Sequence, residues 1–245
     1  MSITCKLSGR IGNNLFQIAA TYAHSLRMKT DFFIPSQYRW HGIRKFKSPF
    51  NLPIKDIKAN IYKESNFHYD QIPEIDNICL DGYFQSEKYW MEYIDEVKEL
   101  FSLGSENISY HKAVCISVRL GDYVNNSNYA QLDKEYYISA YRKYFNGQPI
   151  MMFSDDIELC KIIFNDFDDG NILYIKENDT YEQLRKATWC SDFIISNSTF
   201  SWWMAYLGES MRSTVIRPTK HFDGDLLKLD TKDYYPNNWI PYDQC

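Results

Sequence analysis

From about residue 110 onward, short apolar segments alternate with segments whose apolar residues recur at helical spacing. Strands are expected at 113–118, 149–153, 171–175, 193–196 and 215–217, and helices at 134–145, 157–164, 181–190 and 199–207. This alternation constrains the fold strongly, because parallel strands cannot be joined by a tight turn and are usually connected through a helix. It predicts a parallel sheet with helices on both faces, as in doubly wound α/β proteins.

The N-terminal part begins in the same way but is less regular. We expect a strand at 3–7, a glycine-containing turn at 8–13, a helix at 14–29, a strand at 31–34, an irregular stretch to about 77, a strand at 78–80 and a helix at 85–100. The chain is therefore expected to form two α/β halves, residues 1–110 and 111–245, which are joined near 104–112 and have a cleft between them.

Composition excludes several classes of protein. Of the 245 residues, 44% are hydrophobic and 24% are charged, which is typical of globular domains. No stretch reaches the ~18 uncharged apolar residues of a membrane span. The opening MSITCK does not resemble a secretory signal, so we expect a cytoplasmic location. Because the six cysteines include no C-x-x-C pair, neither a zinc site nor a disulfide framework is expected.

Charge is distributed unevenly along the chain. Residues 1–63 contain eleven Lys or Arg and two Asp, a net charge of +9, whereas residues 64–245 carry −14. One interpretation is that the N-terminal third meets an anionic membrane surface or a phosphate-bearing substrate; the other is that these lysines only solvate a surface. No nucleic-acid-binding motif accompanies the charge, so nucleic acid is not an expected partner.

Four segments with chemically useful residues lie at the ends of expected strands, where open parallel sheets bind ligands. They are 9–14 (GRIGNN), 117–123 (SVRLGDY), 153–156 (FSDD) and 196–203 (SNSTFSWW). The first allows the backbone to approach a ligand at Gly9 and Gly12, but it is neither a G-x-G-x-x-G fingerprint nor a Walker loop. A plain tight turn would explain its glycines without requiring both Arg10 and Asn13.

The other three segments each allow a functional and a structural interpretation. Arg119 is suited to bidentate phosphate binding and Asp122 to orienting it, although a salt bridge at the end of a strand would also explain the pair. The carboxylates of 153–156 either accept from a guanine edge or a ribose hydroxyl, or cap the next helix. The hydroxyl-rich turn at 196–201 opens a helix, which favours phosphate binding, and capping is expected there as well.

Two further patterns are not expected to carry chemistry. Asp223-Gly224-Asp225 matches the D-x-D of metal-dependent sugar transferases, but it falls in an irregular segment, so no metal is assigned to it. No G-x-S-x-G nucleophile elbow is present.

Taken in order, the motifs resemble family 11 of the glycosyltransferases, the α-1,2-fucosyltransferases. The family pattern contains G-R-[LI]-G-N-Q-x-F-Q, G-Y-[FW]-Q-S-E-K-Y, H-x-R-x-G-D-Y, S-D-D and S-x-S-T-F-[SG]-W-W. This chain has GRIGNNLFQ (9–17), GYFQSEKY (82–89), VRLGDY (118–123), FSDD (153–156), SNSTFSWW (196–203) and a fitting C-terminal YPNNW (235–239). It departs at Ser117, where the family has His, at Leu120, where many members have a second Arg, and at Asn14, where they have Gln.

The resemblance implies a GT-B architecture, GDP-β-L-fucose as donor substrate with no cofactor or metal, and inverting transfer to O2 of a terminal β-galactoside. By similarity, Asn13 would position donor and acceptor, and Arg119 would stabilise the leaving pyrophosphate. The residues expected to bind the donor are Gly9, Arg10, Gly12, Arg119, Asp122, Ser154, Asp155, Ser198, Thr199, Phe200 and Ser201. Tyr83 and Glu87 are expected on the acceptor side. Asp122 and Glu87 are candidates for the general base, and neither is singled out.

The partners expected on this reading are a nucleotide sugar and a glycan acceptor, the latter carried on a lipid pyrophosphate at the cytosolic membrane face. Two alternatives stay open. One is a related inverting transferase that uses another nucleotide-linked deoxysugar or another acceptor. The other is a carbohydrate-binding protein without catalysis, which would leave Arg119 and the serine-rich turn unexplained.

Overall fold

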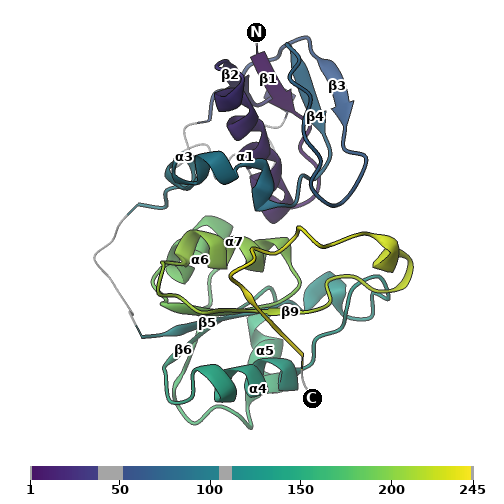
Figure 1. Ribbon diagram of the computed structural model, residues 1–245. Coiled ribbons are helices and arrows are strands. Elements are labelled where there is room, and N and C mark those ends of the chain that lie inside the picture. Colours follow the sequence, from purple (N-terminus) through teal and green to yellow (C-terminus); the bar gives the residue numbers. More distant parts are fainter. Residues whose placement is uncertain (1, 38–51, 105–111, 244–245) are drawn as a thin grey trace. The chain divides into compact units, whose positions relative to one another are not determined.

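The computed structural model describes residues 2–37, 52–104 and 112–243, and the chain divides into two compact units (Figure 1). The N-terminal unit comprises Met1–Gly104 and Leu229–Pro236. The C-terminal unit comprises Ser105–Lys228 and Asn237–Cys245. Each unit contains one parallel sheet, so the predicted α/β class with two parallel sheets is confirmed.

The sheet of the C-terminal unit has six strands in the order β10-β9-β8-β5-β6-β7, and all of its pairings are parallel. The strands are β5 (Val114–Val118), β6 (Ile150–Ser154), β7 (Ile172–Tyr174), β8 (Asp192–Ile195), β9 (Val215–Pro218) and β10 (Ile240–Tyr242). The helices are α4 (Lys134–Tyr144), α5 (Ile157–Phe164), α6 (Thr180–Ala187) and α7 (Thr199–Gly208). Figure 1 shows α4 and α5 on one face of this sheet and α6 and α7 on the other.

The alternation predicted from residue 110 onward is confirmed in this unit, with shifts of one to three residues at most element ends. β10 was not foreseen. Its three residues include Pro241, which lacks a backbone N–H and is tolerated because β10 is an edge strand.

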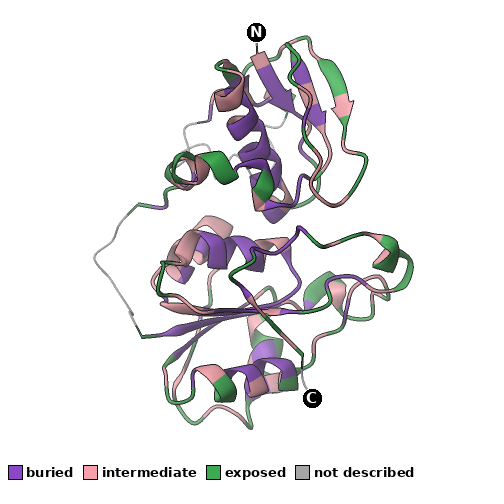
Figure 2. Ribbon diagram, viewed as in Figure 1, coloured by how far each residue is buried: buried purple, intermediate pink, exposed green. Residues whose placement is uncertain are grey.

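The central strand β5 is buried throughout, as Figure 2 shows by its colour. Because successive side chains of a strand point to opposite faces, Val114, Ile116 and Val118 join the core formed with α4 and α5. The alternation turns Cys115 and Ser117 toward the opposite face, which α6 and α7 cover. Sequence patterning thus places Ser117 beside α7.

The helix α7 is largely buried. Trp202 and Trp203 are fully buried, and Trp202 stacks on Tyr206 at 4.5 Å between ring centroids. Trp202 also meets Trp239 of the C-terminal YPNNW segment at 5.3 Å, and the Trp239 Nε1–H donates to Glu209 Oε2 at 2.9 Å. The tryptophans of these two motifs therefore pack together in the interior around α7.

The sheet of the N-terminal unit has four parallel strands in the order β2-β1-β4-β3. They are β1 (Ser2–Cys5), β2 (Asp31–Phe33), β3 (Asn60–Lys63) and β4 (Ile78–Asp81), accompanied by α1 (Ile11–Arg27) and α3 (Ile94–Leu100). The expected helix at 85–100 is wrong in its first part: two 3-10 turns, Glu87–Tyr89 and Met91–Tyr93, precede α3. Trp90, at φ −134°, interrupts the helical path between them.

Two other expectations for this unit are corrected. α1 begins at Ile11, three residues earlier than predicted, so Gly12 and Asn13 lie in its first turn. The stretch expected to be irregular contains β3, whose residues are mostly exposed and therefore lack an apolar pattern. The remainder of that stretch up to residue 51 lies partly outside the described residues.

The segment Leu229–Pro236 packs with the N-terminal unit although it lies late in the sequence. Asp233 pairs with Lys88 at 2.5 Å and accepts from the backbone N–H of Tyr69 at 3.1 Å. Tyr234 is fully buried and stacks on Phe16 of α1 at 6.2 Å. In residues 2–37, 52–104 and 112–243, no helix is long and apolar enough to cross a membrane.

Candidate functional site

In each sheet, the chain adds strands first on one side of the unit's first strand and later on the other side. The place where the order reverses is the topological switch point. In the C-terminal unit this point lies between β5 and β8, and in the N-terminal unit between β1 and β4. Ligands of open parallel sheets bind beyond the carboxyl ends of the strands at such a switch point. Arg119 follows β5 and Ser196 follows β8, whereas Gly9 follows β1 and Gly82 follows β4. The motifs singled out in the sequence therefore lie at both switch points.

In the C-terminal unit, the Arg119 guanidinium lies among three side chains. Its Nη2 contacts Asp122, and its Nη1 lies 3.0 Å from Asp155 Oδ2. Its Cζ lies 5.1 Å from the centre of the Tyr123 ring, a distance at which a cation is attracted to the ring face. The arrangement brings together three of the predicted donor-binding residues, Arg119, Asp122 and Asp155. It also contains the salt bridge at the end of a strand that was the structural interpretation of this segment.

Asp155 holds more than the guanidinium. Its Oδ1 accepts from the Leu120 backbone N–H at 2.9 Å, so the carboxylate fixes the turn that follows β5. A Cβ at Gly121 would lie 2.1 Å from Asp155 Oδ2, which explains why this turn carries glycine. The neighbouring Leu120 is buried in the core beside α4, at the position where many relatives were expected to carry a second arginine.

Three buried serines meet where β5, β8 and α7 converge. The Ser201 hydroxyl lies 2.7 Å from the hydroxyl of Ser117 and 2.7 Å from that of Ser196. Ser117 stands where the family has histidine, and its hydroxyl forms a hydrogen bond with the Ser201 hydroxyl in the interior of the unit. The Ser201 side chain is also directed inward and is 2% exposed, although it had been expected to bind the donor.

The first turns of α7 and α5 are capped by the residues that precede them, as the structural alternatives predicted. Ser198 Oγ accepts from the Phe200 N–H at 3.3 Å, and Asp156 Oδ1 accepts from the Leu159 N–H at 3.0 Å. Ser154 Oγ accepts from the Asp156 N–H at 3.1 Å. Thr199 and Phe200 form the first turn of α7, where backbone N–H groups lack partners within the helix and attract anions.

In the N-terminal unit, the loop after β1 turns at Gly9, which has a φ of +75°. A Cβ at this position would lie 2.1 Å from Asn13 Nδ2, so the missing side chain leaves room for the Asn13 amide. Arg10 is the N-cap residue of α1, and Gly12 is buried in its first turn. The Asn13 Oδ1 accepts from Gln85 Nε2 at 3.0 Å.

Behind Asn13, a network of amides fastens the loop to the sheet. Gln17, fully buried, donates from Nε2 to the Gly82 carbonyl at 2.8 Å and accepts at Oε1 from the Ser8 N–H at 3.1 Å. Asn14 Nδ2 donates to the Ser8 carbonyl at 3.0 Å and to Gln17 Oε1 at 3.2 Å. Asn14, which replaces the family glutamine, thus serves the loop structure.

Gln85 and Glu64 are structural partners of this loop that sequence reasoning did not single out. Glu64 accepts from the backbone N–H groups of Tyr83 at 2.6 Å and Phe84 at 2.9 Å, and burial raises the pKa of its carboxyl. Gln85 could have been chosen from its place in GYFQSEKY, whereas Glu64 lies outside every motif. Tyr83 is 42% exposed, and Glu87 opens the following 3-10 turn.

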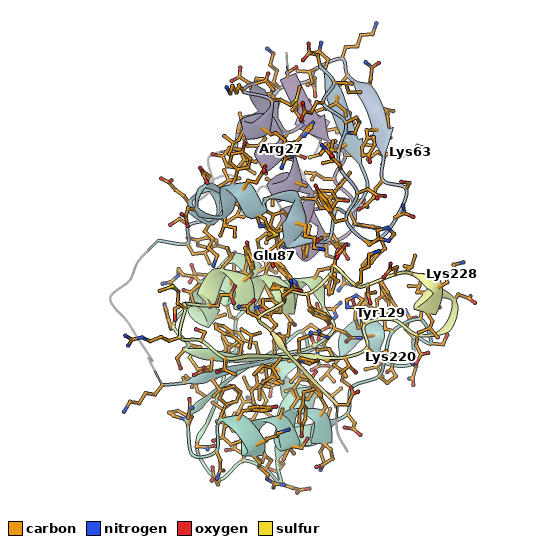
Figure 3. All side chains as sticks on the ribbon, viewed as in Figure 1. Arg27, Lys63, Glu87, Tyr129, Lys220 and Lys228 are labelled. Atoms are coloured by element: carbon orange, nitrogen blue, oxygen red, sulfur yellow. The ribbon has the colours of Figure 1, made fainter. Side chains whose placement is uncertain are left out.

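A row of aromatic rings extends from Arg119 to the segment that carries the D-x-D pattern. Tyr123 stacks on Tyr129 at 3.9 Å, and Tyr129 meets Phe222 at 5.9 Å. Figure 3 labels Tyr129 and Lys220, which come from these two loops. Lys220 pairs with Asp223 at 2.8 Å. Asp223 therefore carries an ion pair within its own loop.

Comparison with known proteins identifies similar sequences over the whole chain. The sequence profile of the family described as Glycosyl transferase family 11 matches residues 2–243. An alpha-1,2-colitosyltransferase of Escherichia coli is 26% identical, over 97% of this chain and 98% of its own length. The O-antigen biosynthesis glycosyltransferase WbnK of Escherichia coli is 25% identical, over 94% of this chain and 98% of its own. A galactoside 2-alpha-L-fucosyltransferase of Caenorhabditis elegans is 25% identical, over 66% of this chain and 52% of its own.

Solved structures of a fucosyltransferase share the fold. NodZ alpha-1,6-fucosyltransferase, co-crystallised with GDP, has a TM-score of 0.52 and 11% identity, covering 83% of this chain and 91% of that one. A structure of NodZ from Bradyrhizobium gives a TM-score of 0.50 with 83% and 90% covered. At this identity the likeness shows the fold alone, which is GT-B-like, as the motifs had implied.

Proposed function

The chain belongs to glycosyltransferase family 11, and from this premise we propose that it transfers L-fucose from GDP-β-L-fucose to O2 of a terminal β-galactoside, with inversion at the anomeric carbon. That it is a glycosyltransferase follows from the family; the donor, the acceptor hydroxyl and the stereochemistry are the proposal.

One observation carries it: Arg119 lies beyond β5 at the switch point of the C-terminal unit, held by Asp122 and Asp155. A preoriented guanidinium at a strand end matches the needs of a diphosphate, which it binds through two parallel N–H groups. When the bond from the sugar to GDP breaks, negative charge develops on the β-phosphate. Arg119 would stabilise that charge, assisted by the backbone N–H groups at the start of α7.

We propose that no divalent cation takes part, and that the diphosphate is stabilised by the Arg119 guanidinium together with the N-terminus of α7. Ser154 is the last residue of the neighbouring strand β6, and Asp155 follows it. We propose that Ser154 faces the nucleoside and that Asp155 acts mainly on Arg119, given its contact at 3.0 Å.

For the N-terminal unit, we propose that Asn13 orients the transferred sugar and the acceptor through its amide. Gln85 donates to Asn13 Oδ1, so the Asn13 Nδ2–H₂ is left to donate, and the absence of a side chain at Gly9 makes room for this amide nitrogen. A neutral amide is suited to sugar hydroxyls, which both donate and accept. Gly9, Arg10 and Gly12 are proposed to approach the sugar end of the donor, and the exposed Tyr83 the acceptor.

A second donor is favoured by one specific observation. The relative that is similar over 97% of this chain carries the name colitosyltransferase. Colitose is L-fucose without its C3 hydroxyl, so both sugars would place the same leaving diphosphate on Arg119. Competition between GDP-fucose and GDP-colitose would separate the two: the natural donor has the higher kcat/KM.

We also propose that the acceptor is a growing surface glycan on a lipid carrier. Two observations support this: the relative WbnK is named an O-antigen biosynthesis glycosyltransferase, and residues 1–63 carry a net charge of +9. Co-sedimentation with vesicles at low salt tests the membrane contact. Binding to anionic but not to neutral vesicles supports the membrane contact, and absence of binding to both contradicts it.

The experiment for the function is GDP release from GDP-fucose in excess EDTA, with and without lactose or N-acetyllactosamine. Acceptor-dependent release supports a metal-independent fucosyltransferase, and NMR of the product assigns the linkage. Slow release that no acceptor accelerates would support the donor and contradict the acceptor. Absence of both release and GDP binding would contradict the donor and favour a carbohydrate-binding protein.

A further inference from the structure

The Arg119 guanidinium is paired with a carboxylate on each of its terminal nitrogens. Asp122 contacts Nη2 and Asp155 lies 3.0 Å from Nη1. The side chain is 15% exposed, and the buried Nε has no hydrogen-bond partner within residues 2–37, 52–104 and 112–243. Because the Nε is buried, a diphosphate reaches this guanidinium through its two terminal nitrogens, and a carboxylate already contacts each of them.

The two carboxylates are held very differently. Asp155 is 24% exposed, accepts from the Leu120 backbone N–H, and fills the space where a Cβ of Gly121 would lie. It is thus built into the turn after β5. Asp122 lies in the 3-10 turn Gly121–Tyr123, three residues after Arg119, and is 54% exposed.

Exposed ion pairs contribute little to stability because water screens them, whereas a carboxylate fixed by backbone is costly to move. The phosphate oxygens of a diphosphate carry more charge than one carboxylate and match the guanidinium geometry. Asp122 is therefore the weaker competitor for Nη2, and Asp155 the stronger anchor for Nη1.

We propose that Asp155 is the positioning residue of Arg119, and that Asp122 occupies the diphosphate place on Nη2 until the donor displaces it. This inference rests on the proposed function, since it takes Arg119 as the group that binds the diphosphate. It assigns opposite effects to two acidic residues that contact the same guanidinium.

Electrostatics alone predicts something else. Removal of either negative charge beside a diphosphate site lowers repulsion, so Asp122→Asn and Asp155→Asn would both tighten binding. The geometry predicts that only Asp122→Asn does so. In Asp155→Asn an amide replaces the carboxylate that pairs with Nη1, so the guanidinium loses its orientation.

The experiment is calorimetric titration of the full chain with GDP, GMP and inorganic pyrophosphate. The variants are Asp122→Asn, Asp155→Asn and the control Glu182→Gln, which removes the partner of Arg185 in a second i,i+3 arginine pair of the same unit. We expect Asp122→Asn to bind GDP and pyrophosphate about 3- to 10-fold more tightly. Asp155→Asn should bind both at least about 10-fold more weakly. GMP, which lacks the β-phosphate, should change less in each variant, and the control should match the wild type.

The inference is overturned if both variants shift GDP affinity in the same direction, or if Asp122→Asn weakens it. If Asp155→Asn does not fold, Asp122→Asn still tests the inference, because unchanged or weaker GDP binding by this variant overturns it. Tighter pyrophosphate binding by Asp122→Asn would support the displacement of Asp122 by a diphosphate. If GDP binds no more tightly than pyrophosphate, guanosine adds nothing to affinity, and that result would contradict a GDP-sugar as the donor. A wild type that binds neither GDP nor pyrophosphate would overturn both proposals.

Discussion

The two switch points share a topology and differ in chemistry. In the N-terminal unit, the side chains beside the loop that follows β1 include neutral amides bonded to one another, with Gln85 on Asn13 and Gln17 bonded to Asn14. In the C-terminal unit, an arginine lies between two carboxylates. An amide whose acceptor is already satisfied is a directed donor for hydroxyls, and a guanidinium is a binder of phosphate. On the proposed function, the fold supplies the place at each switch point, and the side chains decide which part of the substrate is bound there: the sugar by the amides and the diphosphate by the guanidinium.

The largest expected effect is the loss of Arg119. Arg119→Ala should lower kcat/KM by about 1000-fold, because removing a positioned donor from a developing oxyanion costs about 3–4 kcal/mol. Arg119→Lys should recover only part of the rate, since lysine cannot bind in a bidentate manner. Arg142→Ala, which removes another arginine that packs on an aromatic ring in the same unit, is the control. Near-normal transfer by Arg119→Ala would refute the assignment.

The loss of Asn13 should have a smaller effect of another kind. Asn13→Ala should lower the transfer rate by about 100-fold, the cost of about two hydrogen bonds to sugar hydroxyls, and leave GDP affinity unchanged. Steady-state rates together with GDP titration measure this. Asn66→Ala, which removes an exposed amide bonded to Asp70 in the same unit, should show neither change. Equal losses of rate and GDP affinity would contradict the division.

Gln85 should matter less, because it acts through Asn13. Gln85→Glu keeps the shape but cannot donate to Asn13 Oδ1. The loss of this hydrogen bond, about 1 kcal/mol, corresponds to a roughly 5-fold fall in kcat. The expected signature is a lower kcat with unchanged GDP affinity. Gln85→Leu should behave alike, and an unaltered kcat in both variants would show that the contact is only structural.

The smallest expected effect concerns the free energy of unfolding at acidic pH. Burial lowers the pKa of His221 to about 3 and, together with Arg27, that of His24 to about 4. In the unfolded chain each histidine binds a proton near pH 6.5. Its contribution to the free energy of unfolding is therefore fully present above this pH and is lost as the pH falls toward the folded-state pKa values. The slope is at most about 1.4 kcal/mol per pH unit for each histidine. Urea unfolding between pH 7 and 4.5 should show a shallower slope for His221→Gln, and identical slopes would contradict this.

The sequence predicted the C-terminal unit better than the N-terminal one, for physical reasons. Its central strands β5, β6 and β8 are largely buried on both faces, and its helices are short and regular. The spacing of apolar residues therefore indicates both kinds of element. In the N-terminal unit, β3 is mostly exposed and carries no apolar pattern. The 3-10 turns of 87–93 imitate helical spacing, because residues three apart share a face in both structures.

The candidate residues were found from the sequence, but their contacts were not. That Arg119 follows β5 could be read from the strand pattern, whereas its pairing with Asp155 depends on the register between β5 and β6. Ser201 carries no sign in the sequence that it faces Ser117. Glu64 lies outside every motif, and only the fold brings it to Tyr83.

The most direct test of the division between the two units is GDP affinity measured side by side for Asn13→Ala and Arg119→Ala. We expect Asn13→Ala to bind GDP within about 3-fold of the wild type, and Arg119→Ala to bind at least about 30-fold more weakly, since charge-assisted bonds to phosphate are lost. Equal weakening in both variants, or full affinity in Arg119→Ala, would contradict it.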